Sequence, residues 1–183
     1  MRIDNDEVLS TTRRWLEKSV IGLSLCPFAE APYRADRVRF FVSEQRSASG
    51  LLDELRAELL GLQACDPSRC ETALLIHPWV LGDFLEYNDF LDVCDATVED
   101  LGLEGELQVA SFHPHYQFAG TESGDIENFT NRSPYPMLHL LREESVARAI
   151  TAVGDTDEIC RRNIRTLREL GHEGWRRLWI ADP

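Results

Sequence analysis

The run Ala73, Leu74, Leu75 and Ile76 constrains the fold of this chain more than any other segment. Four consecutive apolar residues are typical of a strand that is covered on both faces. Such a strand lies inside a sheet, with helices packed above and below it. The run therefore predicts an α/β protein in which the other elements are arranged around a central strand.

Two further segments resemble strands, and helical patterns separate all three. The strand-like segments are residues 38–42 and 107–111, beside 73–76. Apolar residues at helical spacing mark residues 6–22, 51–62, 84–101 and 136–150 and a segment after residue 155. Strands joined by helices of crossover length favour parallel pairing. We therefore expect a small three-stranded, parallel sheet surrounded by about five helices.

Length and composition indicate one soluble domain over residues 1–183. The chain has an ordinary apolar share of 43% and no apolar run near the roughly twenty residues of a membrane helix. Residues 1–7 carry acidic side chains and no apolar signal core, so we expect a cytoplasmic protein with reduced cysteines. The net charge of −13 argues against nucleic acid as a partner. Neither oligomeric state nor cofactor can be read from the sequence.

Residues 111–118 (Ser-Phe-His-Pro-His-Tyr-Gln-Phe) and 131–136 (Asn-Arg-Ser-Pro-Tyr-Pro) concentrate polar and aromatic side chains. They lie between a predicted strand and a predicted helix, where a connection is usually short. The carboxyl ends of parallel strands meet at one edge, which would bring Glu44, His77 and His113 to the side where α/β sheets usually bind ligands. This region is therefore the predicted functional site.

His113 and His115 are the candidate catalytic residues of this site. In extended backbone, side chains two residues apart project to the same face, so both could reach one substrate group or one metal ion. Zinc would need a further ligand, and no paired-cysteine or helical two-histidine motif supports such a site. Proton transfer, metal binding and a structural role stay open.

An anion site is predicted where Asn131, Arg132 and Ser133 precede the expected helix. Ser133 as N-cap and Pro134 at the first helical position would aim the positive end of the helix dipole at an anion held by Arg132. Alternatively, Arg132 pairs with Asp125 or Glu127 and only fastens the loop.

Tyr135, His139 and Arg142 are the remaining candidate substrate-binding residues. His139 and Arg142 are three residues apart, so they would share one face of the predicted helix 136–150 and could point into the pocket. The alternative is an ordinary polar helix face in solvent.

Cys26 is the candidate nucleophile because Pro27 forces it away from helical geometry and could present its thiol outward. It also follows the carboxyl end of a helix, where the dipole disfavours a thiolate unless His or Arg lies close. A buried structural thiol and a metal ligand are the alternatives. If Cys26 acts in the reaction, it should share one cleft with His113, His115 and Arg132.

The strings Leu25-Cys26-Pro27-Phe28, Ala110-Ser111-Phe112-His113-Pro114 and Asn131-Arg132-Ser133-Pro134-Tyr135-Pro136-Met137-Leu138-His139 resemble the bacterial "domain of unknown function 1415" family. The resemblance covers about residues 8–150, which leaves residues 151–183 as a C-terminal helical extension. It implies no activity. Our leading hypothesis is a small enzyme acting on an anionic, phosphate- or carboxylate-bearing small molecule. The alternatives are a metal-binding protein using His113 and His115, and a non-catalytic interaction module.

Overall fold

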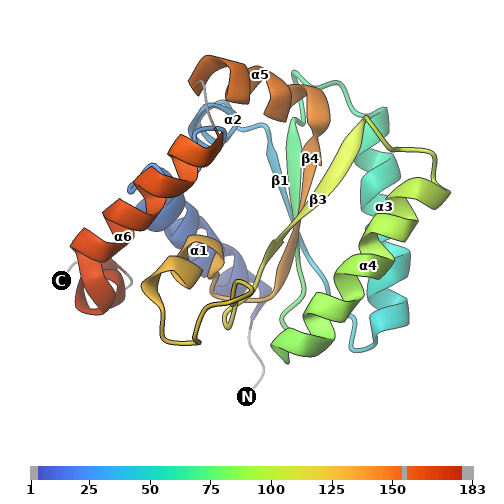
Figure 1. Ribbon diagram of the computed structural model, residues 1–183. Coiled ribbons are helices and arrows are strands. Elements are labelled where there is room, and N and C mark those ends of the chain that lie inside the picture. The colour runs from blue at the N-terminus through green and yellow to red at the C-terminus, as the bar shows by residue number, and fades with distance from the viewer. Residues whose placement is uncertain (1–3, 154–155, 179–183) are drawn as a thin grey trace.

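The apolar run of the sequence forms β2 (Thr72–Ile76), and all five of its residues are buried. The computed structural model describes residues 4–153 and 156–178. Within this part, β2 lies in a four-stranded sheet between β1 (Val38–Val42) and β4 (Met137–Arg142), and β3 (Leu107–Phe112) forms the other edge. The prediction of an α/β fold with β2 in the sheet interior is confirmed (Figure 1).

The predicted three-stranded parallel sheet is wrong because a fourth strand enters it. β1 and β2 are parallel, whereas β4 runs antiparallel to both β2 and β3. The three expected strands therefore point in one direction, but β2 and β3 do not pair with each other. The backbone N–H and C=O groups of β2 and β3 that face each other across the sheet need hydrogen-bond partners. Only an extended segment lying between the two strands can supply them, and that segment is β4.

The predicted helix 136–150 is correspondingly wrong in its first half. Residues Met137–Arg142 form β4, and helix α5 (Glu143–Val153) begins only after it. Leu138 and Leu140 pack in the core on one side of the sheet, while Met137 packs in the core on the other side. This alternation is that of a strand covered on both faces.

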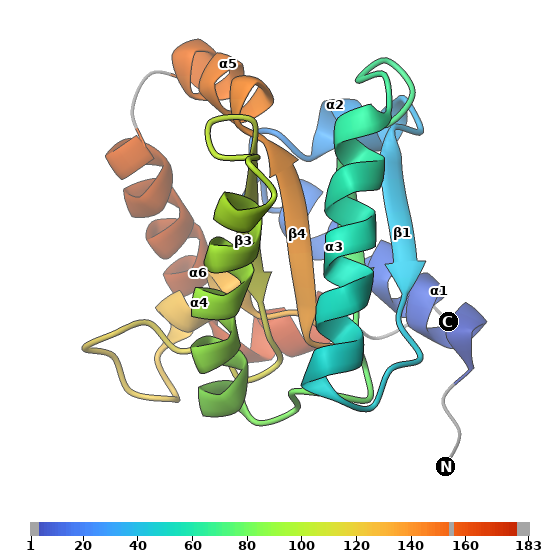
Figure 2. The same ribbon diagram turned by 90° about the vertical axis from the view of Figure 1, so that its right-hand side faces the viewer.

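Helices α3 (Ala48–Ala64) and α4 (Phe84–Asp100) cover one face of the sheet (Figure 2). Ser47 caps α3 by accepting a hydrogen bond from the Gly50 N–H at 3.2 Å, and Asp83 caps α4 through the N–H groups of Leu85 and Glu86. The buried apolar residues of the two helices recur at helical spacing and pack against Leu138 and Leu140.

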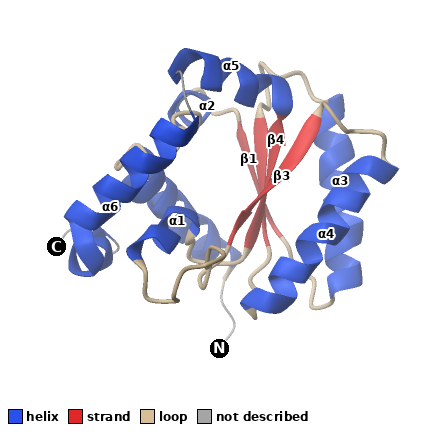
Figure 3. Ribbon diagram, in the orientation of Figure 1, coloured by secondary structure: helices blue, strands red, loops and turns tan. Residues whose placement is uncertain are grey.

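The other face is covered by α1 (Asn5–Trp15), its π-helical continuation η1 (Leu16–Ile21), the short α2 (Glu30–Arg34) and α5 (Figure 3). Val8, Trp15 and Val20 form the core of this layer together with Leu74 and Met137 of the sheet. Among the described helices, none combines the length and the apolar character that crossing a bilayer requires.

Helix α6 (Thr156–Leu178) packs on η2 (Ile126–Asn131) and on the chain before Cys26. Its Asn163 donates a 2.7 Å hydrogen bond to the Leu25 carbonyl, and Leu167 and Trp175 pack against the Leu25 side chain. α6 therefore holds the Cys26 segment in place. Residues 154–155 and 179–183 of the predicted extension lie outside the described residues.

Candidate functional site

Alternation along β4 sends its polar side chains to opposite faces of the sheet. His139 lies beside Leu74 of β2 and faces the layer of α1, α2 and α5, whereas Arg142 reaches the α3 side. The predicted common helix face for these two residues is therefore wrong, because β4 has a period of two rather than 3.6 residues.

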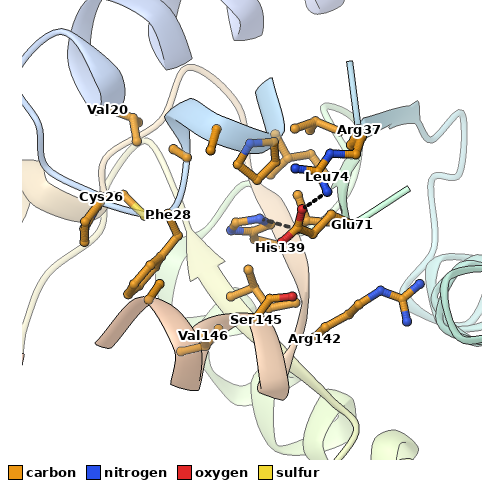
Figure 4. Close-up of a pocket in the computed structure, with 18 of the residues that line it drawn as sticks. Val20, Cys26, Phe28, Arg37, Glu71, Leu74, His139, Arg142, Ser145 and Val146 are labelled. Carbon is orange, nitrogen blue, oxygen red and sulfur yellow. Dashed lines mark hydrogen bonds and ion pairs between the residues drawn. The ribbon is translucent and has the colours of Figure 1, made fainter. Parts of the chain in front are cut away.

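A cavity of about 270 Å³ lies between this sheet face and the helices that cover it (Figure 4). Three aromatic side chains line it, Trp15, Phe28 and Phe112, together with aliphatic residues of η1, β2 and α5. Phe112 contacts Trp15 edge-to-face at 5.3 Å and the His139 ring at 6.1 Å, both between ring centroids. We refer to this cavity as the His139 pocket.

The hydrogen bonds of Thr72 fix the tautomer of His139. The Thr72 hydroxyl has one proton, which it donates to the Leu140 carbonyl at 2.6 Å. His139 Nε2 lies 2.7 Å from the same hydroxyl oxygen and must therefore be the donor in that contact. The proton of a neutral imidazole thus resides on Nε2, and Nδ1 is left as a hydrogen-bond acceptor.

Burial keeps His139 and Cys26, two of the titratable residues that line the pocket, uncharged near neutral pH. Desolvation lowers the pKa of His139 from 6.5 to about 4. Burial likewise raises the pKa of the Cys26 thiol, although the backbone N–H groups of Phe28 and Ala29 partly oppose the effect. The pocket therefore contains a neutral imidazole and a protonated thiol, and Cys26 lacks the thiolate that a nucleophile needs.

Charged side chains gather on one side of the pocket, away from Cys26 and Phe28 (Figure 4). Arg37 and Glu71 form an ion pair at 2.7 Å, and Arg148 of α5 lies 3.9 Å from the same carboxylate. Arg142 also borders the pocket, but its Nη2 donates to the carbonyls of Leu62, Cys65 and Cys70 at 2.6, 2.6 and 3.2 Å. Arg142 thus fastens the end of α3 to the sheet.

His113 lies on the α4 side of the sheet and not in the His139 pocket. Its Nδ1 accepts from the His115 N–H at 3.0 Å, and its Nε2 lies 3.2 Å from the Leu81 carbonyl, to which it donates. Burial lowers the pKa of His113 to about 4. Both ring nitrogens are therefore occupied in this structure, which leaves none for a substrate or a metal ion.

His77 lies close to His113, as expected for residues at the carboxyl ends of parallel strands. Both rings contact Tyr87, at centroid distances of 5.8 Å for His77 and 5.0 Å for His113. His115 is exposed. Within residues 4–153 and 156–178, no group of three or more His, Cys, Asp and Glu side chains is placed to hold a metal ion.

The predicted anion-binding residues stabilise the segment between β3 and β4. Arg132 donates to the carbonyls of Tyr116 and Ser123 and stacks on Phe129, with its Cζ atom 4.2 Å from the ring centroid. Asn131 donates to the Ser111 carbonyl at 3.1 Å. Arg132 thus fastens the loop through carbonyl groups rather than through the expected carboxylates.

Ser133 and Tyr135 do not start a helix, because β4 follows them. Ser133 donates to the Tyr135 carbonyl at 2.7 Å and is 6% exposed. The predicted N-cap at Ser133 and the helix dipole behind it are therefore wrong. Of the predicted site residues, the structure brings Cys26 and His139 into one pocket and places Arg142 at its border, while His113, His115 and Arg132 lie elsewhere.

The sequence analysis missed Thr72, Arg37, Glu71 and Arg148. Glu71 and Thr72 directly precede the apolar run of β2, and a polar pair at the start of a buried strand was the available signal. No comparable pattern in the sequence marked Arg148. Its place at the pocket depends on the boundary between β4 and α5, which the sequence analysis did not predict.

The fold and the pocket define a mixed α/β protein with a cavity enclosed between an open sheet and its helices. The chain belongs to the family described as "Protein of unknown function (DUF1415)", whose model matches residues 7–177. The match confirms the resemblance and extends it over α6. Neither a curated protein nor a solved structure matches the chain.

Proposed function

We propose that this protein binds a small organic anion, an anionic group attached to an apolar body, in the His139 pocket. The observation that carries the proposal is a single cavity combining aromatic walls, a neutral imidazole acceptor and a pair of arginines on one side. Pockets for small molecules are typically mostly apolar, with a few polar groups that fix orientation. The volume suits a small metabolite rather than a nucleotide.

The anionic end of the ligand would bind at Arg37 and Arg148. Glu71 is the carboxylate shared by both guanidinium groups, so a second anion can pair with the sides that Glu71 leaves free. Arg148 also pairs with Glu144, whose side chain is 85% exposed, and such exposed pairs contribute little stability. The apolar walls favour a carboxylate over a phosphate, because a dianion is costlier to desolvate.

His139 would accept a hydrogen bond from a hydroxyl or N–H group of the ligand through Nδ1. With its pKa lowered to about 4, His139 is a weak base and does not supply positive charge for an anion near pH 7. Catalysis on such an anion stays a prediction, in which His139 would act as an acceptor and Cys26 as a neutral thiol.

Thermal unfolding with matched probes tests the proposal. Para-hydroxyphenylacetate carries both a carboxylate and a hydroxyl donor, and its neutral alcohol analogue lacks the carboxylate. We expect the acid to raise the melting temperature more than the alcohol does, and inorganic phosphate to have no effect. Arg148→Gln should reduce the shift with the acid and leave the shift with the alcohol. Arg56→Gln, on the opposite face of the sheet, is the control and should change neither.

A second variant locates the binding. Val146 lines the pocket, and Val146→Trp should fill it and abolish both shifts. Undiminished shifts in a folded Val146→Trp protein would place the ligand elsewhere and overturn the proposal.

A further inference from the structure

Cys65 and Cys70 lie together where α3 ends and β2 is about to begin. The turn between them is closed by hydrogen bonds from the N–H groups of Arg69 and Cys70 to the Asp66 carbonyl, at 2.9 and 3.0 Å. The Asp66 side chain accepts from the Ser68 N–H at 2.8 Å. The two cysteines are thus the ends of a tight, well-bonded turn.

Arg142 holds the backbone at both cysteines. Its Nη2 atom donates to the Cys65 carbonyl at 2.6 Å and to the Cys70 carbonyl at 3.2 Å, so both oxygens converge on one nitrogen. A disulfide requires Cα atoms roughly 4.4–6.8 Å apart. The shared donor holds the backbone carbonyls of the two cysteines near one atom and so keeps the two segments together.

The two cysteines line the same hollow and differ in access to solvent. The Cys65 side chain lies near enough to Cys70 to help raise the pKa of the Cys70 thiol, and both residues line a surface hollow. Cys65 is partly exposed, whereas Cys70 is 6% exposed and its Sγ lies 3.6 Å from the Thr72 carbonyl, to which the thiol donates. An external reagent would therefore reach Cys65 first and Cys70 second.

The hollow is basic. Arg37, Arg39 and Arg69 line it, and Asp36 is the acidic residue among the lining side chains. Arg37 and Arg39 also form ion pairs with Glu71 and Glu58, at 2.7 and 3.5 Å, which compensate part of their charge. The guanidinium groups attract anionic reagents. The hollow thus suits a disulfide that carries carboxylates. Burial raises the pKa of the Cys70 thiol despite the opposing effect of Arg39 and Arg142, so Cys70 suits the second step of the exchange rather than the first.

We propose that Cys65 and Cys70 form a redox-active dithiol, which low-molecular-weight anionic disulfides oxidise to an intramolecular disulfide. The Cys65 thiolate attacks one sulfur of the reagent, which breaks the reagent's S–S bond and releases one thiolate. Cys70 then loses its proton to solvent and attacks Cys65 Sγ in the mixed disulfide, which releases the second thiolate. The two cysteines lose two electrons and two protons, and the reagent becomes two thiols.

The pair is one contact away from the His139 pocket, through Thr72, and two contacts away from His139 itself. Oxidation removes the Cys70 S–H donor from the Thr72 carbonyl, and the Thr72 hydroxyl is the acceptor of His139 Nε2. The dithiol itself does not depend on what the pocket binds.

Mass spectrometry of the full chain after incubation with oxidised glutathione tests the proposal. We expect the peptide that contains Cys65 and Cys70 to lose two hydrogen masses as a cross-linked species, whatever adduct Cys160 carries, and dithiothreitol to reverse the change. At low ionic strength, oxidised glutathione should react faster than the cationic disulfide cystamine. Equal or inverted rates would overturn the role of the basic hollow.

Two variants complete the test. Cys65→Ser should abolish the cross-link, whereas Cys160→Ser, which removes an exposed cysteine of α6, should leave it unchanged. Cys160 in the wild type also reports that the reagent is active. A stable glutathione adduct on Cys65 with Cys70 still open to alkylation would overturn the proposal. The same holds if neither cysteine reacts while Cys160 does.

Discussion

Acid should destabilise this protein between about pH 6.5 and pH 4, because desolvation holds two buried histidines and the half-buried His139 neutral. Burial is the main cause that lowers the pKa of His77, His113 and His139 from 6.5 to about 4. Above pH 6.5 these histidines are neutral in both the folded and the unfolded state, and stability is complete. As the pH falls, the unfolded chain takes up protons first, so stability is lost until the folded pKa is reached.

The size of this loss follows from the difference between the two pKa values. A shift from 6.5 to about 4 corresponds to roughly 3 kcal/mol for each histidine. Three such residues together approach about 9 kcal/mol, which is within the roughly 5–15 kcal/mol of a typical domain. The free energy of unfolding should therefore fall by up to about 4 kcal/mol per pH unit near pH 5.

Urea denaturation across this pH range measures how steeply the free energy of unfolding changes with pH. One substitution shows how much of that slope comes from His139. His139→Gln retains a donor for the Thr72 hydroxyl but cannot take up a proton, so the slope should fall by about one third. His172→Gln, at an exposed position of α6, is the control and should leave the slope unchanged. A wild-type slope in the His139→Gln protein would refute the inference that desolvation holds His139 in its neutral form.

Three further outcomes are expected from the contacts described above. Arg142→Met should lower the free energy of unfolding by about 2–4 kcal/mol, measured by urea denaturation, because three backbone carbonyls lose their charged donor. A loss near zero would mean that water replaces the guanidinium group without cost. Asn128→Ala should lower the free energy of unfolding by about 2–3 kcal/mol, because the buried Asn128 side chain makes three hydrogen bonds within the loop. It should also speed proteolysis of residues 113–136, and unchanged cleavage would show that other contacts hold the loop. Cys26 should resist iodoacetamide near neutral pH until the protein unfolds, because burial raises the pKa of its thiol; rapid alkylation of the native protein, read by mass spectrometry, would restore it as a nucleophile.

Local sequence patterns were sufficient to predict the type and approximate bounds of elements such as α4 and β1. The helix predicted at 84–101 is α4, and the strand predicted at 38–42 is β1 with the same bounds. β4 was different. Met137, Leu140 and Leu141 fit helical spacing, but a strand covered on both faces is apolar at nearly every position and fits the same letters. The segment is a strand rather than a helix because it fills the gap between β2 and β3. That gap exists only in the folded protein and cannot be seen in the local sequence.

The candidate site shows the same division. Cys26 and His139 were recognised as chemically unusual, and both line the pocket. Their partners could not be found this way, because Thr72 meets His139 only through the register of β2 with β4. The motif-rich segment 111–136 attracted attention for its polar side chains, yet Arg132 and Asn131 serve its internal hydrogen bonds. A long loop without regular sheet or helix partners must satisfy its own carbonyl groups, and such residues resemble a binding site in sequence.

The position of β4 determines when this protein can fold during synthesis. β2 and β3 are joined only through β4, the last strand of the sheet to leave the ribosome. Until then, β1 and β2 form at most a two-stranded pair, which is marginally stable, and β3 has no partner. A nascent chain that stops before residue 137 would keep its apolar strands exposed to chaperones and proteases. Closure of the sheet by β4 is thus a step that must wait until the three other strands have been synthesised.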